Sequence, residues 1–387
     1  MESKQMPSRI RRPVTVALAL AALALFSAPG LSGGKMPCDA TRAVDVVICL
    51  DVSGSMQDLL DSARARVWDV VNELARMKPT PELRVGLLSY GTDKSVADDG
   101  WIDVHLDLTD DLDGVYAELM ALTIGGHEEY VGRALDTALD EIGWSPDRDV
   151  LRILFITGNE SADQGVESHD FRVAARAASD RGIIVNALYA GNRDQGIAEM
   201  WPEVARRGDG VFSAIDPSSG TIQIPTPQDE NLLALNAKLN TTYLPYGERG
   251  NDGLTNQLAQ DANATRLGVQ SCSSRIVAKG SALYTNASWD LVDAALEEGF
   301  DWDDLDPQDL PEELRAMTYE QLDAHIETVR VKREEIQHEI QLVSAERENY
   351  IKAVLAKDPA ALNGLGGAML EAIREQAGAK GFSRDDS

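Results

Sequence analysis

The sequence predicts an α/β fold with a doubly wound, mostly parallel six-stranded sheet flanked by helices, followed by an α-helical C-terminal region. Between about residues 44 and 215, short apolar runs alternate with amphipathic stretches of helical periodicity. The runs are apolar on both faces, which is typical of strands covered by helices on both sides. A late, uninterrupted helical pattern adds one long helix to the C-terminal region.

Composition sets the broad class of protein. With 387 residues, the chain is long enough for two or three domains. Its 43% hydrophobic and 26% charged residues are typical of a globular protein. The 36 basic residues stand against 64 acidic ones, and the resulting net charge of −28 excludes nucleic acid as a partner and favours divalent cations or basic partners.

The N-terminus predicts export. Basic residues precede an apolar run over 14–26, and small residues then break this run, so residues 1–32 have the layout of a secretory signal peptide. We therefore expect an exported protein, periplasmic or secreted. The alternative is an uncleaved N-terminal anchor facing outside, the one case in which the chain would contact a membrane. Export would permit a disulfide between Cys38 and Cys272, whereas Cys49 lies in an apolar run and is expected to be buried.

The expected elements follow one another along a domain at 41–216. The strands are the apolar runs 44–50, 83–90, 102–108, 151–156, 183–189 and 211–214. The helices between them are the periodic stretches 57–77, 111–122, 131–142, 170–181 and 194–206. Residues 217–228 are rich in proline and small residues, so they read as a linker that ends this domain.

The remaining chain is expected to be helical. Residues 229–317 read as a helical and irregular region, 318–377 as a long helix and a terminal helix, and 378–387 as a disordered tail. Thr318 and Gln321 form a capping box that starts the long helix. Its apolar seam is interrupted by Arg333 and Arg347, which favours packing on its own chain, for example as a hairpin with the terminal helix. A homo-oligomer through a coiled coil is the alternative.

The first expected strand ends in a group of oxygen-bearing side chains. Asp51, Ser53 and Ser55 follow it directly, and Gly54 permits a tight bend before the next helix. In open α/β sheets, sites are built at the carboxyl ends of strands. Ligands that carry only oxygen suit Mg²⁺ or Mn²⁺, so the turn is a candidate metal site.

Together with the strand and helix order across 41–216, Asp51-x-Ser53-x-Ser55 resembles the von Willebrand factor type A domain and its metal-ion-dependent adhesion site. The resemblance covers roughly half of the chain. It implies that Ser53 and Ser55 bind the metal through their hydroxyls and that Asp51 acts mainly through water. It also implies a protein ligand whose acidic residue fills the vacant coordination position.

The sequence departs from the family's pattern at two positions. The threonine expected before the middle helix falls on Glu129, beside Glu128, and the aspartate expected after the fourth strand falls on Gly158. The next acidic residues are Glu160 and Asp163. Our hypothesis is that Glu129 or Glu128 fills the vacant position from within the chain. The alternative is that these glutamates pair with neighbours such as Arg133 and leave a turn without metal.

No motif indicates an enzyme. The Gly-x-Ser-x-Gly match at 30–34 lies at the end of the signal segment, and the five histidines are scattered. A P-loop, a GxGxxG and an HExxH motif are all missing from the sequence. We therefore expect an exported, non-enzymatic, protein-binding protein. The alternative is a scaffold protein of the cell envelope with a vestigial metal site, in which the long helix mediates assembly.

Overall fold

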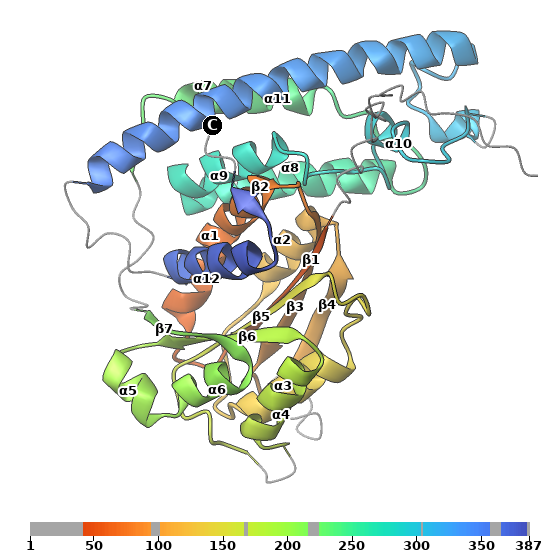
Figure 1. Ribbon diagram of the computed structural model, residues 1–387. Coiled ribbons are helices and arrows are strands. Elements are labelled where there is room, and N and C mark those ends of the chain that lie inside the picture. The colour runs from red at the N-terminus through yellow and green to blue at the C-terminus, as the bar shows by residue number, and fades with distance from the viewer. Residues whose placement is uncertain are drawn as a thin grey trace, which may run out of the picture. The chain divides into compact units, whose positions relative to one another are not determined.

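The centre of the fold is a six-stranded sheet with the strand order β4-β3-β1-β5-β6-β7 (Figure 1). The computed structural model describes residues 42–93, 101–165, 169–215, 224–302, 305–356 and 365–384. Only β4 is antiparallel to its neighbour, which confirms the predicted fold class. The strands are β1 (Ala43–Asp51), β3 (Glu82–Tyr90), β4 (Ile102–Thr109), β5 (Leu151–Gly158), β6 (Ile183–Ala190) and β7 (Asp209–Ile215).

The helices between the strands are those that the sequence predicts, with one exception. They are α1 (Gln57–Ala75), α2 (Leu112–Ala121), α3 (Val131–Asp140), α4 (Phe171–Asp180), α5 (Arg193–Ala198) and α6 (Trp201–Arg207). The single helix expected over 194–206 is divided into α5 and α6, because Met200 adopts a left-handed conformation with φ 70°. This turn places the fully buried Trp201 so that its indole N–H donates to the Glu160 carbonyl after β5, at 2.7 Å.

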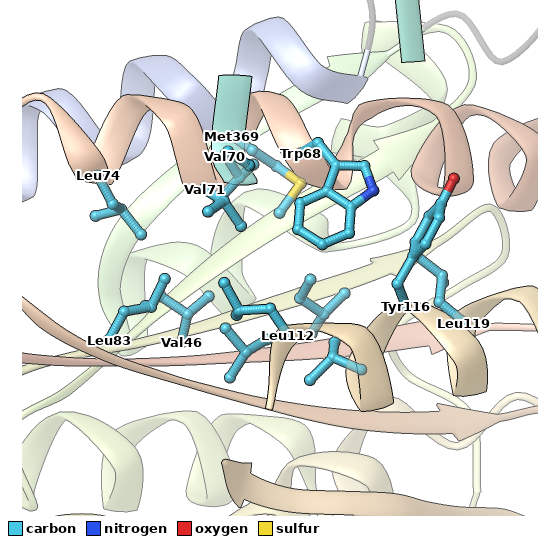
Figure 2. Packing of buried hydrophobic residues seen from close by; sticks show 14 of the residues in the cluster. Val46, Trp68, Val70, Val71, Leu74, Leu83, Leu112, Tyr116, Leu119 and Met369 are labelled. Atoms are coloured by element: carbon cyan, nitrogen blue, oxygen red, sulfur yellow. The ribbon is translucent and has the colours of Figure 1, made fainter. Parts of the chain in front are cut away.

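Alternate side chains of the strands face two separate cores. Val46 and Leu50 of β1 belong to a core with α1 and α2, whereas Val47 and Cys49 belong to a core with α3, α4 and α6. Figure 2 shows the first core, where Trp68 of α1 meets Tyr116 of α2 edge to face at a centroid distance of 5.1 Å. Helices therefore cover both faces of the sheet, as predicted from the apolar strands.

The C-terminal helices pack onto the α1 and α2 side of the sheet. They are α7 (Asp229–Asn240), α8 (Gly250–Leu267), α9 (Val269–Lys279), α10 (Leu291–Ala294), η5 (Pro307–Asp309), α11 (Tyr319–Leu355) and α12 (Leu365–Ala379). Helix α9 contacts α1, α8 contacts α2, and α11 contacts α7, α9 and α10. All of this belongs to one compact unit, Ala40–Ser387, so the helical region is docked on the α/β domain.

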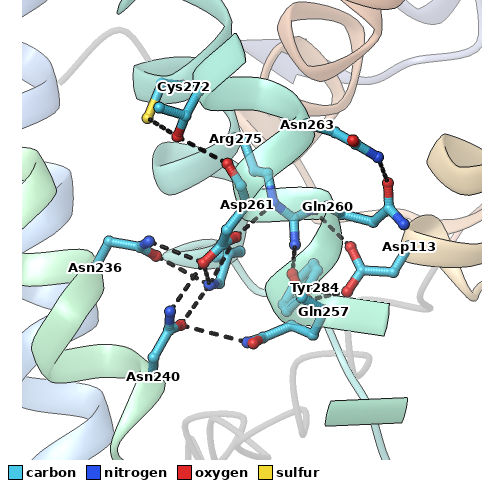
Figure 3. A network of polar contacts seen from close by, with 12 residues as sticks. Asp113, Asn236, Asn240, Gln257, Gln260, Asp261, Asn263, Cys272, Arg275 and Tyr284 are labelled. Carbon is cyan, nitrogen blue, oxygen red and sulfur yellow. Dashed lines mark hydrogen bonds and ion pairs between the residues drawn. The ribbon is translucent and has the colours of Figure 1, made fainter. Parts of the chain in front are cut away.

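A buried polar network joins α9 to α2 and α8 (Figure 3). The Arg275 guanidinium donates to Asp113 of α2 and to Asp261 of α8, both at 2.6 Å, and to the Gln257 carbonyl at 3.0 Å. Lys279, one turn later, donates to the other Asp261 oxygen at 2.9 Å. Because Arg275 and Lys279 are almost completely buried, the network fixes how the helical region meets the α/β domain.

The long helix α11 starts at the predicted capping box of Thr318 and Gln321. The two arginines that interrupt its seam are buried anchors. Arg333 donates to Asp290 at 2.6 Å, and Arg347 donates to Asp229 at 2.8 Å. These ion pairs explain why arginine occupies seam positions, because the helix docks on its own chain through charged groups. A homo-oligomer through this helix stays a prediction.

The C-terminus corrects two expectations. Helix α12 packs on α1 and against β5, β6 and β7 instead of forming a hairpin with α11. Its Gln376 exchanges two amide hydrogen bonds with Asn186 of β6, at 2.7 and 3.1 Å. The tail expected to be disordered from residue 378 is ordered up to Arg384, because Phe382 is buried and β8 (Ser383–Arg384) pairs with β2 (Met77–Lys78).

Other expectations lie outside the described residues. The signal segment 1–32, Cys38 and most of the linker belong there, so cleavage and the Cys38–Cys272 disulfide stay predictions. Cys49 is buried, as expected, and the thiol of the buried Cys272 lies 3.5 Å from Thr265 Oγ1. Among the helices that the structure describes, none is both long and apolar enough to span a bilayer.

The Asp229–Arg347 pair predicts a dependence of stability on pH. Burial alone would raise the pKa of Asp229, but hydrogen bonds from Arg347, Thr226 and Ser273 outweigh it and hold the pKa below its usual value. The stabilisation is therefore present above the unfolded pKa of about 3.9 and lost as the pH falls through the lower folded value. We expect Asp229→Asn to lower the free energy of unfolding by about 3 kcal/mol near neutral pH, as for a broken buried pair.

Urea unfolding of wild type and Asp229→Asn, at neutral pH and in steps down to the lowest pH at which both proteins stay folded, measures this difference. The two proteins should converge in acid. Asp61→Asn, at an exposed carboxylate paired with Arg64, is the matched control and should have little effect at either pH. A difference between wild type and Asp229→Asn that persists unchanged in acid would contradict the assignment.

Candidate metal centre

The turn after β1 is tied to two other loops at the carboxyl edge of the sheet. Val52 N–H donates to the Tyr90 carbonyl at the end of β3, at 2.9 Å. Gly54 N–H donates to the Gly126 carbonyl at 3.2 Å, and Gly125 N–H donates to the Val52 carbonyl at 2.9 Å. Because β1 lies between β3 and β5, the turn sits where the strand order changes direction, the place where open α/β sheets build their sites.

Three predicted site residues converge beside Gly91. Asp51 Oδ1 accepts a hydrogen bond from Ser53 N–H at 2.8 Å. A methyl group placed on Gly91 would lie 2.9 Å from Asp51 Oδ1, 3.3 Å from Glu129 Cγ and 3.4 Å from Ser53 Cβ. With φ of +86°, Gly91 also has a conformation that favours glycine. Glu129 therefore lies against the turn that carries Asp51 and Ser53.

The two carboxylates of this group are buried and incompletely paired. Asp51 is 1% exposed and Glu129 is 3% exposed. Within the described part of the chain, Asp51 Oδ2 and Glu129 Oε2 are buried without a hydrogen-bond partner. Burial raises the pKa of both groups, and the Glu129 charge raises the pKa of Asp51 further. Two buried carboxylates side by side need a cation or a shared proton to offset their repulsion.

Ser55 and Asn159 lie at the mouth of the site. Ser55 is exposed, its Oγ lies 3.4 Å from Ser53 Oγ, and it accepts a hydrogen bond from Asn159 Nδ2 at 2.9 Å. Asn159 follows the end of β5 directly, and its Oδ1 is buried without a partner among the described residues. Our sequence reasoning missed Asn159, although a polar residue directly after a central strand was a usable signal.

The other predicted site residues have different surroundings. Glu128 is exposed and accepts from the Tyr130 hydroxyl at 3.0 Å. Asp163 is held by Arg172 through two hydrogen bonds, at 2.8 and 3.0 Å. Glu160 is exposed and accepts from Gln164, but it is close enough for its charge to raise the pKa of Glu129.

Arg133, the alternative partner for the glutamates, lies 3.3 Å from His169. Of the predicted acidic residues Glu128, Glu129, Glu160 and Asp163, Glu129 is therefore the one whose side chain is buried beside Asp51.

The residues present fit a hard divalent cation. No three His, Cys, Asp or Glu side chains gather in the described ranges closely enough to hold a metal. A centre here would therefore combine the carboxylates of Asp51 and Glu129 with the hydroxyls of Ser53 and Ser55. Such an oxygen-only set suits Mg²⁺ or Mn²⁺, which retain water molecules when protein ligands are few. The buried oxygens without a hydrogen-bond partner, Asp51 Oδ2 and Glu129 Oε2, are the observation that favours a cation here.

Gly158 shows why the carboxylate expected after β5 is missing. A Cβ at this position would lie 2.6 Å from the Tyr90 hydroxyl and 2.8 Å from Trp201 Cζ2. The Tyr90 hydroxyl donates to the Thr157 carbonyl at 2.6 Å and so holds the ring in place. The buried Tyr90 and Trp201 rings occupy the space that a larger residue at 158 would need.

Part of the chain matches a known protein family. The family model for the von Willebrand factor type A domain matches residues 45–206. No curated protein matches the chain. Among solved structures, an aerotolerance-related membrane protein from Bacteroides fragilis is similar, with 20% identity and a TM-score of 0.32 over 45% of this chain and 92% of that one.

Two further solved structures are similar to this chain. A von Willebrand factor type A structure from Catenulispora acidiphila has 17% identity and a TM-score of 0.34, over 46% of this chain and 40% of that one. Proximal thread matrix protein 1 from the mussel byssus, with a zinc-occupied MIDAS motif, has 15% identity and a TM-score of 0.34, over 46% of this chain and 42% of that one.

Domains of the matched family typically mediate protein–protein interaction and commonly bind a divalent metal. The match spans β1 to α6, and the turn with Asp51, Ser53 and Ser55 lies at the carboxyl end of β1. Residues 45–206 of this chain are therefore a von Willebrand factor type A domain.

Proposed function

We propose that the chain is an exported, non-enzymatic protein that binds a protein ligand at the carboxyl edge of its von Willebrand factor type A domain. In this proposal, Asp51, Ser53, Ser55 and Glu129 hold Mg²⁺ or Mn²⁺. The supporting observation is the pair of buried, unpartnered oxygens, Asp51 Oδ2 and Glu129 Oε2. A dication between them would offset the repulsion of two buried negative charges.

Glu129 stands where the family pattern has a threonine, and its carboxylate changes how a ligand could bind the metal centre. By the family resemblance, an acidic residue of the partner fills a vacant position on the metal. Here the buried Glu129 carboxylate supplies that second negative charge from within the chain. The exposed carboxylates of Glu128 and Glu160 stand near the same edge and would repel an acidic partner. The centre would therefore hold the three loops together, and the ligand would bind the surface that they form.

Removal of either buried carboxylate tests the centre. In chelator, Asp51→Asn and Glu129→Gln should each raise the free energy of unfolding by about 1 kcal/mol, because each removes one of two buried like charges. Both variants should lose the response to Mg²⁺. For wild type, Mg²⁺ at about one hundred times its Kd should add about 2.7 kcal/mol. Urea unfolding in Mg²⁺ and in chelator, with a calorimetric Mg²⁺ titration, measures these effects.

Glu128→Gln and Asp163→Asn are matched controls, because each removes an exposed carboxylate that is bonded to Tyr130 or Arg172 and is not buried beside Asp51. Both should keep the response to Mg²⁺. A wild type whose unfolding is the same in Mg²⁺ and in chelator would contradict the proposal. In that case the two carboxylates share a proton, and the site is vestigial.

The alternative role, as a cell-envelope scaffold, differs in what partner binding requires. If the metal edge binds the ligand, chelator and Asp51→Asn should both release a co-purifying partner. If the long helix mediates assembly, the partner should survive chelator and be lost only when exposed residues of α11 change. Leu342 and Val331 are large exposed apolar residues of that helix and the natural positions for the second test.

A further inference from the structure

A fully buried lysine lies against two asparagine side chains and a carboxylate inside the helical region. Lys279 of α9 donates to the amide oxygen of Asn240 at 2.6 Å and to that of Asn236 at 2.9 Å, both on α7. Its amine also donates to Asp261 Oδ2 of α8 at 2.9 Å. An amine, two amides and a carboxylate from three different helices therefore meet at one buried point.

The carboxylate of Asp261 orients both amides. Its Oδ2 accepts a hydrogen bond from Asn236 Nδ2 and another from Asn240 Nδ2, each at 2.9 Å. Figure 3 shows these three side chains pointing toward one another. Each amide thus turns its nitrogen toward Asp261 and its oxygen toward Lys279. The amide nitrogen faces a group that can bring it a proton, and the carbonyl faces the amine.

Asn240 is the better placed of the two amides. Its oxygen is the nearer one to Lys279, and it also accepts a hydrogen bond from Gln257 Nε2 at 3.5 Å (Figure 3). Because a C=O bond is about 1.23 Å long, the Asn240 amide carbon lies within about 4 Å of the Lys279 nitrogen. A small rotation of the lysine side chain would reach the separation of about 3–3.5 Å at which bound groups react. The hydrogen bond from Gln257 would also stabilise negative charge that develops on the oxygen.

The amine of Lys279 has the surroundings of a nucleophile. Burial lowers its pKa to about 8 against the attraction of Asp261, and the Arg275 charge lowers it further. An amine attacks a carbonyl carbon only without its extra proton, so the lowered pKa raises the reactive share at neutral pH. Full burial, with the Tyr243 ring 5.7 Å from the Lys279 nitrogen, keeps away the water that would compete.

We propose that Lys279 and Asn240 form an intramolecular isopeptide bond that joins α9 to α7. The neutral Lys279 amine attacks the amide carbon of Asn240, and a new C–N bond forms. Asp261 takes one proton from the attacking nitrogen and passes it to the Asn240 nitrogen, whose bond to carbon then breaks. One ammonia molecule leaves, and it takes up the proton that the lysine ammonium first lost. Atoms and charge therefore balance without a further reactant.

The bond would fix the centre of the helical region covalently. Helix α9 contacts α1 of the α/β domain, and α7 contacts the long helix α11. A link between these two helices joins residues 39 positions apart in the sequence. It would constrain the unfolded chain as a disulfide does, so it would stabilise the docked helices. The reaction is independent of the metal edge and of the function proposed for it.

Mass spectrometry of the purified full chain tests the bond. The masses of wild type and Lys279→Met should differ by the value for the substitution, offset by one ammonia molecule that wild type has lost. In a tryptic digest of wild type, the segments with Lys279 and Asn240 should appear as one branched peptide, because trypsin does not cleave after an acylated lysine. Asn240→Ala should restore the full mass. Asn236→Ala, one turn earlier on α7, is the matched control and should keep the loss of ammonia.

The wild-type result decides the question even if a variant fails to fold. Wild type with its full mass after storage near pH 8, where much of Lys279 is neutral, would overturn the proposal. A loss of ammonia that Asn240→Ala retains would overturn it as well. So would a loss that maps to a single unbranched peptide, as for a succinimide at an asparagine.

Discussion

Arg275→Met should lower the free energy of unfolding by about 3–5 kcal/mol, the usual cost of removing one partner of a buried ion pair. Arg275 is 1% exposed and is bonded to Asp113 and Asp261 on two different helices. Its guanidinium also lies 4.8 Å from the centre of the Trp68 ring. Without it, Asp261 keeps Lys279, but among the described residues the buried Asp113 carboxylate keeps no side-chain partner besides the Tyr284 hydroxyl.

Urea unfolding of the variant measures this loss. The double variant Arg275→Met/Asp113→Asn should recover part of it, because the uncompensated charge is then gone. Arg330→Met removes an arginine whose pairs with Glu327 and Glu334 lie on the surface of α11, and it should change stability by less than about 1 kcal/mol. If Arg275→Met cost no more than Arg330→Met, the network of Figure 3 would not be what docks the helical region.

Gly158→Asp should destabilise the protein by about 3 kcal/mol or more, although it restores the residue that the family pattern expects. The new Cβ would clash with the Tyr90 hydroxyl and the Trp201 ring, both fully buried. The new carboxylate would add a third negative charge near Asp51 and Glu129. We therefore expect Gly158→Asp to be less stable than wild type in chelator, and to gain nothing in Mg²⁺ that compensates for the clash.

Gly158→Ala separates the two causes. It adds the Cβ without the charge, so overpacking alone should cost about 1–3 kcal/mol. Thermal unfolding of the three proteins ranks them as wild type, Gly158→Ala and Gly158→Asp in order of falling stability. A Gly158→Asp protein at least as stable as wild type would show that Tyr90 and Trp201 can move aside.

The sheet and most helices could be predicted because their signals are local. Apolar runs and helical periodicity mark them, and the capping box of Thr318 and Gln321 marks the start of α11. The break at Met200 could not be predicted, since burial of Trp201 against β5 imposes the left-handed turn. The role of the arginines in the seam of α11 could not be predicted either. Arg333 and Arg347 bind Asp290 and Asp229, which lie 43 and 118 residues away in the sequence.

The candidate site could be predicted from the sequence, except for the choice between Glu128 and Glu129. The turn of Asp51, Ser53 and Ser55 could be identified from spacing and its place after a strand. Sequence could not decide between Glu128 and Glu129, because adjacent glutamates differ only in which way the loop before α3 turns them. In the structure, Glu129 is buried beside Asp51, while Glu128 accepts from the Tyr130 hydroxyl. Because Glu129 is the buried one of the two, we propose it, and not Glu128, as the metal ligand.

The most direct test of the metal centre is a crystal structure of the protein grown with Mn²⁺, with diffraction measured at the manganese absorption edge. We predict an anomalous peak between Asp51, Ser53 and Glu129, with an oxygen of Glu129 about 2.1–2.2 Å from the ion, close to the distance typical of Mg²⁺. If the site showed no such peak and Glu129 and Asp51 were joined by a short hydrogen bond, the proposed metal centre would be contradicted.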